Sequence, residues 1–137
     1  MILVRPIAQA AEAAPLLRIL RDKLDTPTFE ARLTAAVAQG YKVVAAFDGH
    51  QMIGALGYRI TSDLCWGRTL YIDDLVVDPG ARGKGTGRRL LEEAHSLAKG
   101  CDTMRLCSGL SRHDAHRFYE ANGFDRFSLQ FVARMEG

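Results

Sequence analysis

Residues 68–99 read RTLYIDDLVVDPGARGKGTGRRLLEEAHSLAK. The first ten of these residues form a β-rich, mostly apolar run that predicts a buried central strand, and Asp78-Pro79-Gly80 ends it. From Arg88 to Lys99, leucines and alanines recur at the spacing of one helix face. A strand therefore leads through the glycine-rich stretch Arg82–Gly87 into an amphipathic helix, an arrangement that places backbone N–H groups at a helix N-terminus.

The rest of the chain predicts further elements of one domain covering 1–137. Hydrophobic periodicity indicates helices over 8–24, 27–40 (with Thr26 as the N-cap) and 114–122. Runs rich in β-forming residues indicate strands over 2–6, 41–47, 52–60, 103–108, 124–127 and 129–132. This order implies an α/β (α+β) fold: a mixed, mostly antiparallel, twisted sheet of about six to seven strands flanked by about four helices.

Composition narrows the class of protein. The formal net charge is only +2, with acidic and basic residues interleaved, so no nucleic-acid partner is expected. The three cysteines show neither CxxC spacing nor a zinc-finger pattern with histidines, which predicts reduced thiols and no metal. No apolar run resembles a signal peptide or a membrane span, so we expect a cytoplasmic protein without a membrane partner.

The glycine-rich stretch does not match the two common nucleotide loops. A Walker A loop requires a hydroxyl residue directly after its lysine, and Lys84 is followed by Gly85. A Rossmann fingerprint belongs to a first βα unit, whereas this loop follows half of the chain. On its own the stretch is either an anion-binding loop or a glycine-rich turn without a ligand.

Two motifs together resemble the GNAT superfamily of acyl-CoA-dependent N-acetyltransferases. One is Arg82-x-x-Gly85-x-Gly87 after the Val-Val-Asp-Pro strand end, and the other is AHRFYEANGF over 115–124. The order of elements also matches that of the superfamily over nearly the whole chain. The resemblance implies acetyl-CoA as co-substrate, bound by backbone groups of the central strand and by the glycine loop: Leu75, Val76, Val77, Arg82, Gly83, Lys84, Gly85, Thr86, Gly87 and Arg88. Arg112 departs from the family pattern, because many members carry there an asparagine that contacts the cofactor. Arg112 could bind a cofactor phosphate, bind an acidic group of the acceptor, or be solvated.

The resemblance also implies catalytic roles for two residues. The acceptor amine must lose a proton before it attacks, and the departing thiolate leaves more readily when it is protonated. Tyr119 takes the place of the superfamily's acid. Asp73 lies where related enzymes handle the acceptor's proton, here through a relayed water because aspartate is short. Strand alternation predicts that Asp73 and Asp74 point to opposite faces, and either could instead be a hydrogen-bonded structural acid.

The acceptor is the least specified part of the reaction. The resemblance places its pocket near Phe29, Trp66, Tyr71 and Asp74, although Trp66 could equally be packing. A short chain without an extra domain favours a small-molecule primary amine, attacking acetyl-CoA directly in a ternary complex. A protein lysine or N-terminal acetyltransferase and a non-catalytic acetyl-CoA sensor remain alternatives. Homodimerisation through the C-terminal strands or a sheet edge stays open.

Overall fold

The computed structural model describes residues 1–135. The chain divides into two compact units, Met1–Leu106 and a second unit that begins at Cys107. Each unit is described by itself below.

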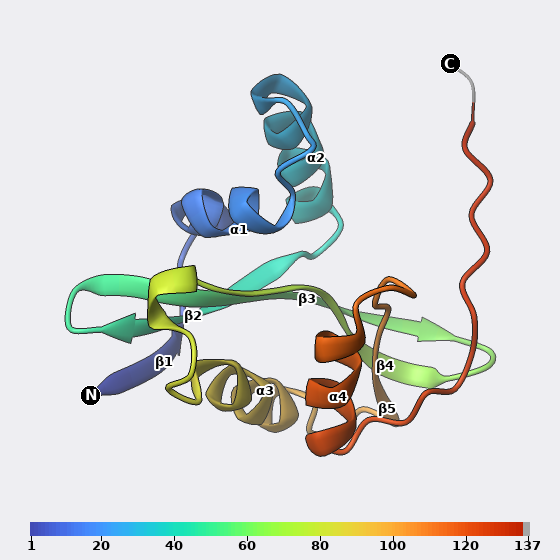
Figure 1. Cartoon of the computed structure of the whole chain (residues 1–137). Coiled ribbons are helices and arrows are strands. Elements are labelled where there is room, and N and C mark those ends of the chain that lie inside the picture. The colour runs from blue at the N-terminus through green and yellow to red at the C-terminus, as the bar shows by residue number, and fades with distance from the viewer. Residues whose placement is uncertain (136–137) are drawn as a thin grey trace. The chain divides into compact units, whose positions relative to one another are not determined.

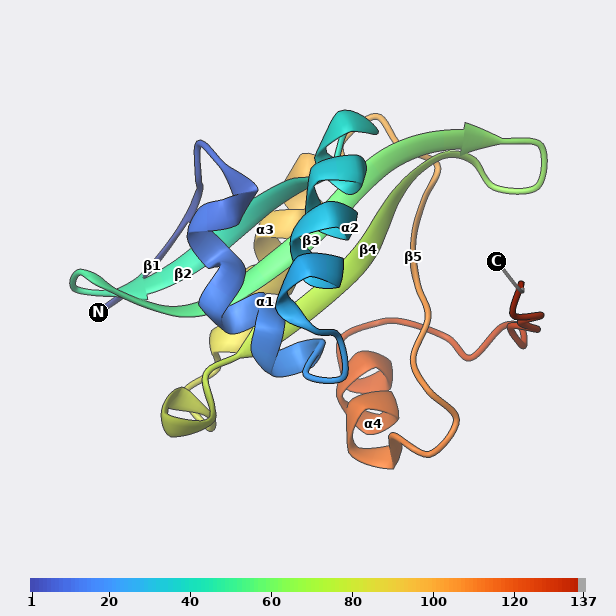
Figure 2. The same cartoon turned by 90° about the horizontal axis from the view of Figure 1, so that it is seen from above.

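The first unit is built on a five-stranded sheet in the order β1-β2-β3-β4-β5 (Figure 2). Its strands are β1 (Ile2–Pro6), β2 (Lys42–Asp48), β3 (Gln51–Asp63), β4 (Gly67–Val77) and β5 (Thr103–Leu106). The first four pair antiparallel, and β4 pairs with β5 in parallel. The predicted mixed, mostly antiparallel sheet is confirmed.

Helices cover both faces of this sheet (Figure 1). On one face lie the 3-10 helix η1 (Ala10–Ala13), α1 (Ala14–Leu20) and α2 (Thr26–Ala38), and on the other face lies α3 (Thr86–Leu97). The predicted helix over 8–24 is therefore shorter, and it begins as a 3-10 turn. The N-cap of α2 is Asp25 rather than Thr26, since the Asp25 carboxylate accepts from the Thr28 N–H at 2.8 Å.

Two layers of apolar side chains hold these elements together. Beneath η1, α1 and α2 the buried cluster joins helix residues to alternate positions of the strands, and it comprises Ala10, Ala13, Leu16, Leu17, Phe29, Tyr41, Val43, Ala55 and Val76. Beneath α3, the helix buries Leu90, Leu91 and Ala94. Each buried leucine side chain contributes about 1.5–3 kcal/mol to stability, so both helical layers fix the ends of β3 and β4 firmly.

The second unit contains one helix, α4 (His113–Ala121), close to the predicted range. The predicted strands over 124–127 and 129–132 are wrong: residues 124–135 carry no regular secondary structure. A strand needs a neighbouring ladder for its backbone N–H and C=O groups, and no strand lies between 107 and 135 to provide one. The chain therefore has five strands in its described part, fewer than expected, and its four α-helices match the prediction.

Candidate active site

The loop before α3 presents an open helix N-terminus. Gly83 and Gly85 adopt positive φ angles of 83° and 75°, a conformation that favours glycine. Gly85 is the N-cap of α3 and provides no side-chain acceptor, so the N–H groups of the first turn lack a side-chain cap. Arg82 and Lys84 are exposed beside these donors. Backbone N–H groups, the helix dipole and two cations together can bind a pyrophosphate.

Two other loop residues differ in what they can offer an anion. The side chain of Thr86 is 2% exposed, and its Oγ1 is buried without a hydrogen-bond partner in the described structure. Thr86 can therefore contribute only its backbone N–H. The Arg88 side chain is 74% exposed and lies 3.8 Å from Glu92, a loose pair that leaves its guanidinium able to reach a phosphate.

Strand β4 provides unpaired backbone directly before this loop. Its pairing with β5 ends at Ile72–Leu106, whereas β4 continues to Val77. Over Leu75–Val77 the strand pairs with β3 on one side and has no strand on the other among residues 1–135. Peptide groups on that open side can bind an extended ligand such as a pantetheine arm, because an unpaired strand edge presents both donors and acceptors.

A β-bulge in the pairing of β3 with β4 changes the prediction for Asp73 and Asp74. Gly57 pairs with Asp74 and Tyr58 with Ile72, so Asp73 is the extra residue. The expected opposite orientation of the two aspartates is wrong, because the bulge interrupts the strand alternation. Their carboxylates lie on the α1–α2 face, and burial, together with the negative charges of both, raises the pKa of Tyr41.

The Asp73 carboxylate is held by an arginine from the neighbouring strand. Arg59 donates from Nε to Oδ2 at 3.0 Å and from Nη2 to Oδ1 at 2.7 Å. This pairing raises the pKa of Arg59, so the guanidinium stays charged. A bidentate arginine uses one lone pair on each carboxylate oxygen, which leaves each oxygen one further acceptor position for a water or an ammonium group.

Asp74 of β4 forms a second network with Arg21, directly after α1, and Tyr41, directly before β2. Tyr41 donates its hydroxyl proton to Asp74 Oδ2 at 2.7 Å, and Arg21 donates from Nε to Oδ1 at 2.9 Å and from Nη2 to the Asp73 carbonyl at 2.9 Å. Burial raises the pKa of Tyr41 far above its ordinary range, and the charge of Asp74 adds to this effect. With 14% of its side chain exposed and both oxygens engaged, Asp74 fixes the segment after α1 over the strand.

The predicted acceptor residues fall in two different environments. Phe29 is 6% exposed in the core, with the Arg18 guanidinium 5.3 Å from its ring centroid, so it offers no surface for an acceptor. Trp66 and Tyr71 are half-buried, and the Arg105 guanidinium packs over both rings at 5.3 and 5.2 Å. Tyr71 is in register with Arg59 of β3 and Arg105 of β5, and the same Arg59 holds the Asp73 carboxylate.

The second unit holds the predicted acid. Tyr119 on α4 contacts Phe118 and Phe124 edge to face, with ring centroids 5.4 and 5.8 Å apart. Burial raises the pKa of Tyr119, and the positive charge of Arg112 acts in the opposite direction. A phenol that keeps its proton above neutral pH can act as a general acid. Arg112, directly before α4, is exposed.

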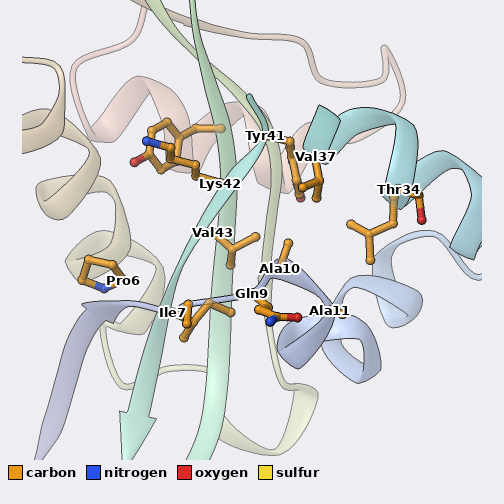
Figure 3. A pocket seen from close by; sticks show the side chains of 13 residues that line it. Pro6, Ile7, Gln9, Ala10, Ala11, Thr34, Val37, Tyr41, Lys42 and Val43 are labelled. Atoms are coloured by element: carbon orange, nitrogen blue, oxygen red, sulfur yellow. The ribbon is translucent and has the colours of Figure 1, made fainter. Parts of the chain in front are cut away.

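A cleft of the first unit lies elsewhere on this face, between η1, α2 and β2 (Figure 3). It encloses about 480 Å³ and is lined mainly by apolar side chains, with Gln9, Thr34 and Lys42 among the polar ones. Neither the glycine loop nor the aspartates of β4 contribute to its lining. The cleft is therefore distinct from the residues that the sequence singles out.

A family comparison identifies this arrangement. The model of the acetyltransferase (GNAT) family matches residues 10–124. The chain belongs to the GNAT acetyltransferase family. This GNAT protein is an N-acetyltransferase by class, as the two motifs predicted. The matched range includes the glycine loop, the bulged strand β4 and the helix that carries Tyr119.

Individual relatives agree with this class. The GNAT chain is 37% identical over 112 residues to an uncharacterized N-acetyltransferase of Bacillus subtilis, YhdJ, which covers 80% of this chain and 79% of the relative. It is 37% identical over 63 residues to an aminoalkylphosphonate N-acetyltransferase of Salmonella typhimurium, covering 44% and 41%. The solved structure of AAC(6')-Iy with the bisubstrate analog CoA-S-monomethyl-acetylneamine has the same fold, with a TM-score of 0.83, 16% identity and coverage of 100% and 99%.

Four residues of the site were not predicted from the sequence: Arg21, Tyr41, Arg59 and Arg105. Their roles depend on strand register, which places Arg59 opposite Tyr71 and next to Asp73. The one sequence signal was Gly57 inside an apolar strand, because an interior glycine often marks a bulge or a close approach. Within residues 1–135, no helix is long and apolar enough to cross a membrane.

Proposed function

We propose that the whole chain acts as one N-acetyltransferase domain that transfers the acetyl group of acetyl-CoA to a primary amine of a small molecule. The observation that carries this proposal is the junction of β4 and α3. There an unpaired strand edge, two positive-φ glycines and an uncapped helix N-terminus follow one another without interruption.

The donor would bind along this junction. The pyrophosphate would accept from the backbone N–H groups around Gly85–Gly87, with Arg82, Lys84 and Arg88 neutralising its charge. The pantetheine arm would extend along Leu75–Val77, where a backbone N–H aimed at the acetyl carbonyl would stabilise the developing oxyanion. Arg112 is assigned to a phosphate of the same ligand.

Acetyl transfer would proceed by direct attack of the amine on the thioester carbonyl. The amine nitrogen forms the new C–N bond, the C–S bond breaks, and the thiolate takes a proton from Tyr119. The phenol of Tyr119 is protonated at neutral pH, as a general acid must be. A thiol of pKa about 8.5 is then released in its neutral form.

The proton of the acceptor ammonium would leave through a water on Asp73. Arg59 occupies one acceptor position on each oxygen of that carboxylate, so the remaining positions can orient a water beside the amine. Both oxygens of Asp74 already accept hydrogen bonds from Tyr41 and Arg21. We therefore assign Asp74 a structural role in the wall of the acceptor site, next to Trp66 and Tyr71.

A small-molecule acceptor is favoured by what the relatives act on. The Salmonella relative is named for aminoalkylphosphonates, and AAC(6')-Iy was solved with an acetylneamine analog; both are small amines.

A thiol-release assay with acetyl-CoA and a panel of primary amines tests the proposal. Turnover of at least one small amine, faster than hydrolysis of acetyl-CoA alone, is the expected result. Heat stabilisation by acetyl-CoA without turnover of any small amine or lysine peptide would instead support a sensor. Turnover of lysine peptides alone would assign a protein acceptor.

A further inference from the structure

Arg105 stands out among the arginines on the α1–α2 face. It lies on β5 in register with Tyr71 of β4, and its guanidinium packs over the rings of Tyr71 and Trp66. The side chain is 29% exposed. Stacking on two aromatic rings fixes the plane of a guanidinium, so this cation is positioned before any ligand arrives.

The hydrogen-bonding capacity of Arg105 is largely unused. Within residues 1–135 its one ion pair joins Nη2 to Asp63 at 3.4 Å, and the Asp63 side chain is itself 38% exposed. Its Nε is buried and finds no acceptor in the described part of the chain. By contrast, Arg59 and Arg21 each donate two bonds of 3.0 Å or less to the aspartate segment of β4.

The position of Arg105 relative to Asp73 suits a small bifunctional molecule. Tyr71 is the β4 partner of Arg105, and Asp73 lies two residues further along β4. Neighbouring strands are about 4.8 Å apart and two residues span about 6.6 Å, so the two Cα atoms are about 8 Å apart. A ligand with an amine near Asp73 and an anionic group one to three carbons away would reach the Arg105 guanidinium.

We propose that Arg105 binds an anionic group of the acceptor, so that the acceptor is a small primary amine carrying a phosphonate, phosphate or carboxylate group. The inference rests on the proposed acetyl transfer and adds the chemical class of its acceptor. A planar guanidinium with two free N–H directions matches the oxygens of such groups in a bidentate pair. Asp73 receives the amine end, and Arg105 sets the distance between the two ends.

Three amines of similar length provide the test: 2-aminoethylphosphonate, β-alanine and ethanolamine. Thiol release gives kcat/KM for the wild type and for Arg105→Gln, Arg105→Lys and Arg32→Gln, an exposed arginine of α2 that serves as the control. We expect the wild type to prefer an anionic amine over ethanolamine by about 10- to 100-fold, the range of a charge-assisted pair. The kcat/KM values for 2-aminoethylphosphonate and β-alanine show whether Arg105 prefers a phosphonate or a carboxylate group.

The variants separate binding of the anion from general damage. Arg105→Gln should raise KM for the anionic amines far more than for ethanolamine and so abolish their preference. Arg105→Lys should keep part of the preference, because lysine retains the positive charge but cannot donate the two parallel hydrogen bonds of a guanidinium. An equal loss on all three amines, or no preference in the wild type, would overturn the inference.

A binding measurement distinguishes this inference from the proposed function. Calorimetric titration of 2-aminoethylphosphonate and ethanolamine into the CoA-bound protein needs no turnover. If no amine is acetylated but the phosphonate still binds the wild type and not Arg105→Gln, acetyl transfer fails and the anion site holds. If neither variant nor wild type binds the phosphonate better than ethanolamine, the anion site fails, whatever the turnover.

Discussion

The phenol of Tyr41 occupies the space that a side chain on Gly57 would need. A β-carbon built on Gly57 would lie 2.6 Å from Cε1 of Tyr41 and still closer to its Cζ and hydroxyl oxygen. Because Gly57 is the β3 partner of Asp74, the missing side chain is what lets the Tyr41 hydroxyl reach that carboxylate at 2.7 Å. One glycine thus permits the network that fixes the bulged segment of β4.

Gly57→Ala should therefore destabilise the fold. Gly57 has no positive φ, so the cost is steric overpacking, about 1–3 kcal/mol in the free energy of unfolding. Chemical denaturation measures it. Combining Gly57→Ala with Tyr41→Phe should not restore stability, because ring carbons of Tyr41 clash as well as its hydroxyl. In a Tyr41→Ala background the clash is absent, so Gly57→Ala should cost less stability there than it does in the wild type.

Gly80→Ala provides the matched control for this steric argument. An added β-carbon there would meet its nearest atom, Asp78 Oδ2, at 3.8 Å, an ordinary contact. We expect a change within about 0.5 kcal/mol. Equal effects of Gly57→Ala and Gly80→Ala would show that the close packing of Tyr41 against β3 does not exist.

Tyr41→Phe makes a separate prediction about pH. At neutral pH the loss of a hydrogen bond to a carboxylate should cost about 1.5–3 kcal/mol of stability. The folded-state pKa of Tyr41 is raised above its unfolded value of about 10, so its contribution is complete below pH 10 and decreases as pH rises further. The gap between wild type and variant should then narrow by about 1.4 kcal/mol per pH unit. A constant gap from pH 9 to 11 would contradict the buried, protonated phenol.

Sequence patterns predicted the elements of this protein better than its site. Periodicity located the four α-helices and the five strands of the described chain because each buries one face or one run, as in α3 with Leu90, Leu91 and Ala94. The same patterns failed at 124–132, where alternating apolar residues such as Phe127 and Leu129 are 75% and 66% exposed and form no strand. Strand propensity describes a residue, whereas a strand also requires a neighbour.

The site shows the same division between local and distant information. The glycine loop is local, so its sequence sufficed to predict a glycine-rich stretch that leads from a strand into a helix, and the structure shows that two of its glycines adopt positive φ angles. The partners of Asp73 and Asp74 depend on a register shift between β3 and β4, which no local pattern encodes. Arg59, Arg21 and Tyr41 come from three separate parts of the chain, and only the fold brings them to the aspartates.

Asp73→Asn should remove the relay for the acceptor's proton. We expect kcat/KM at pH 7 to fall at least about 100-fold, the usual contribution of a general base. The kcat/KM of Asp73→Asn should rise about tenfold per pH unit up to the pKa of the amine, because the fraction of neutral amine in solution rises by that factor. Asp48→Asn, an exposed acid of the β2–β3 hairpin, should change neither value. A parallel pH profile in Asp73→Asn and wild type would place the base elsewhere.

Tyr119→Phe should slow release of the thiolate while leaving acetyl-CoA binding intact. A drop in kcat of about 100-fold or more is expected from loss of the acid, with Kd for CoA nearly unchanged. Tyr58→Phe is the matched control, since burial also raises the pKa of Tyr58, on β3. If kcat is unaltered in Tyr119→Phe, the raised pKa reflects packing alone and water protonates the leaving group.

The loop before α3 gives the last prediction, on affinity for CoA. Lys84→Gln removes an exposed cation beside the uncapped helix N-terminus, so Kd should rise about 3- to 10-fold and the difference should shrink in high salt. Gly85→Ala forces a side chain into a φ of 75°, at a cost of about 1–2 kcal/mol, and should weaken binding further by distorting the first turn. Lys99→Gln, beyond the C-terminal end of the same helix, should bind CoA like the wild type. Calorimetry with CoA measures all three, and equal Kd values for Lys84→Gln and Lys99→Gln would mean that the pyrophosphate does not bind at this loop.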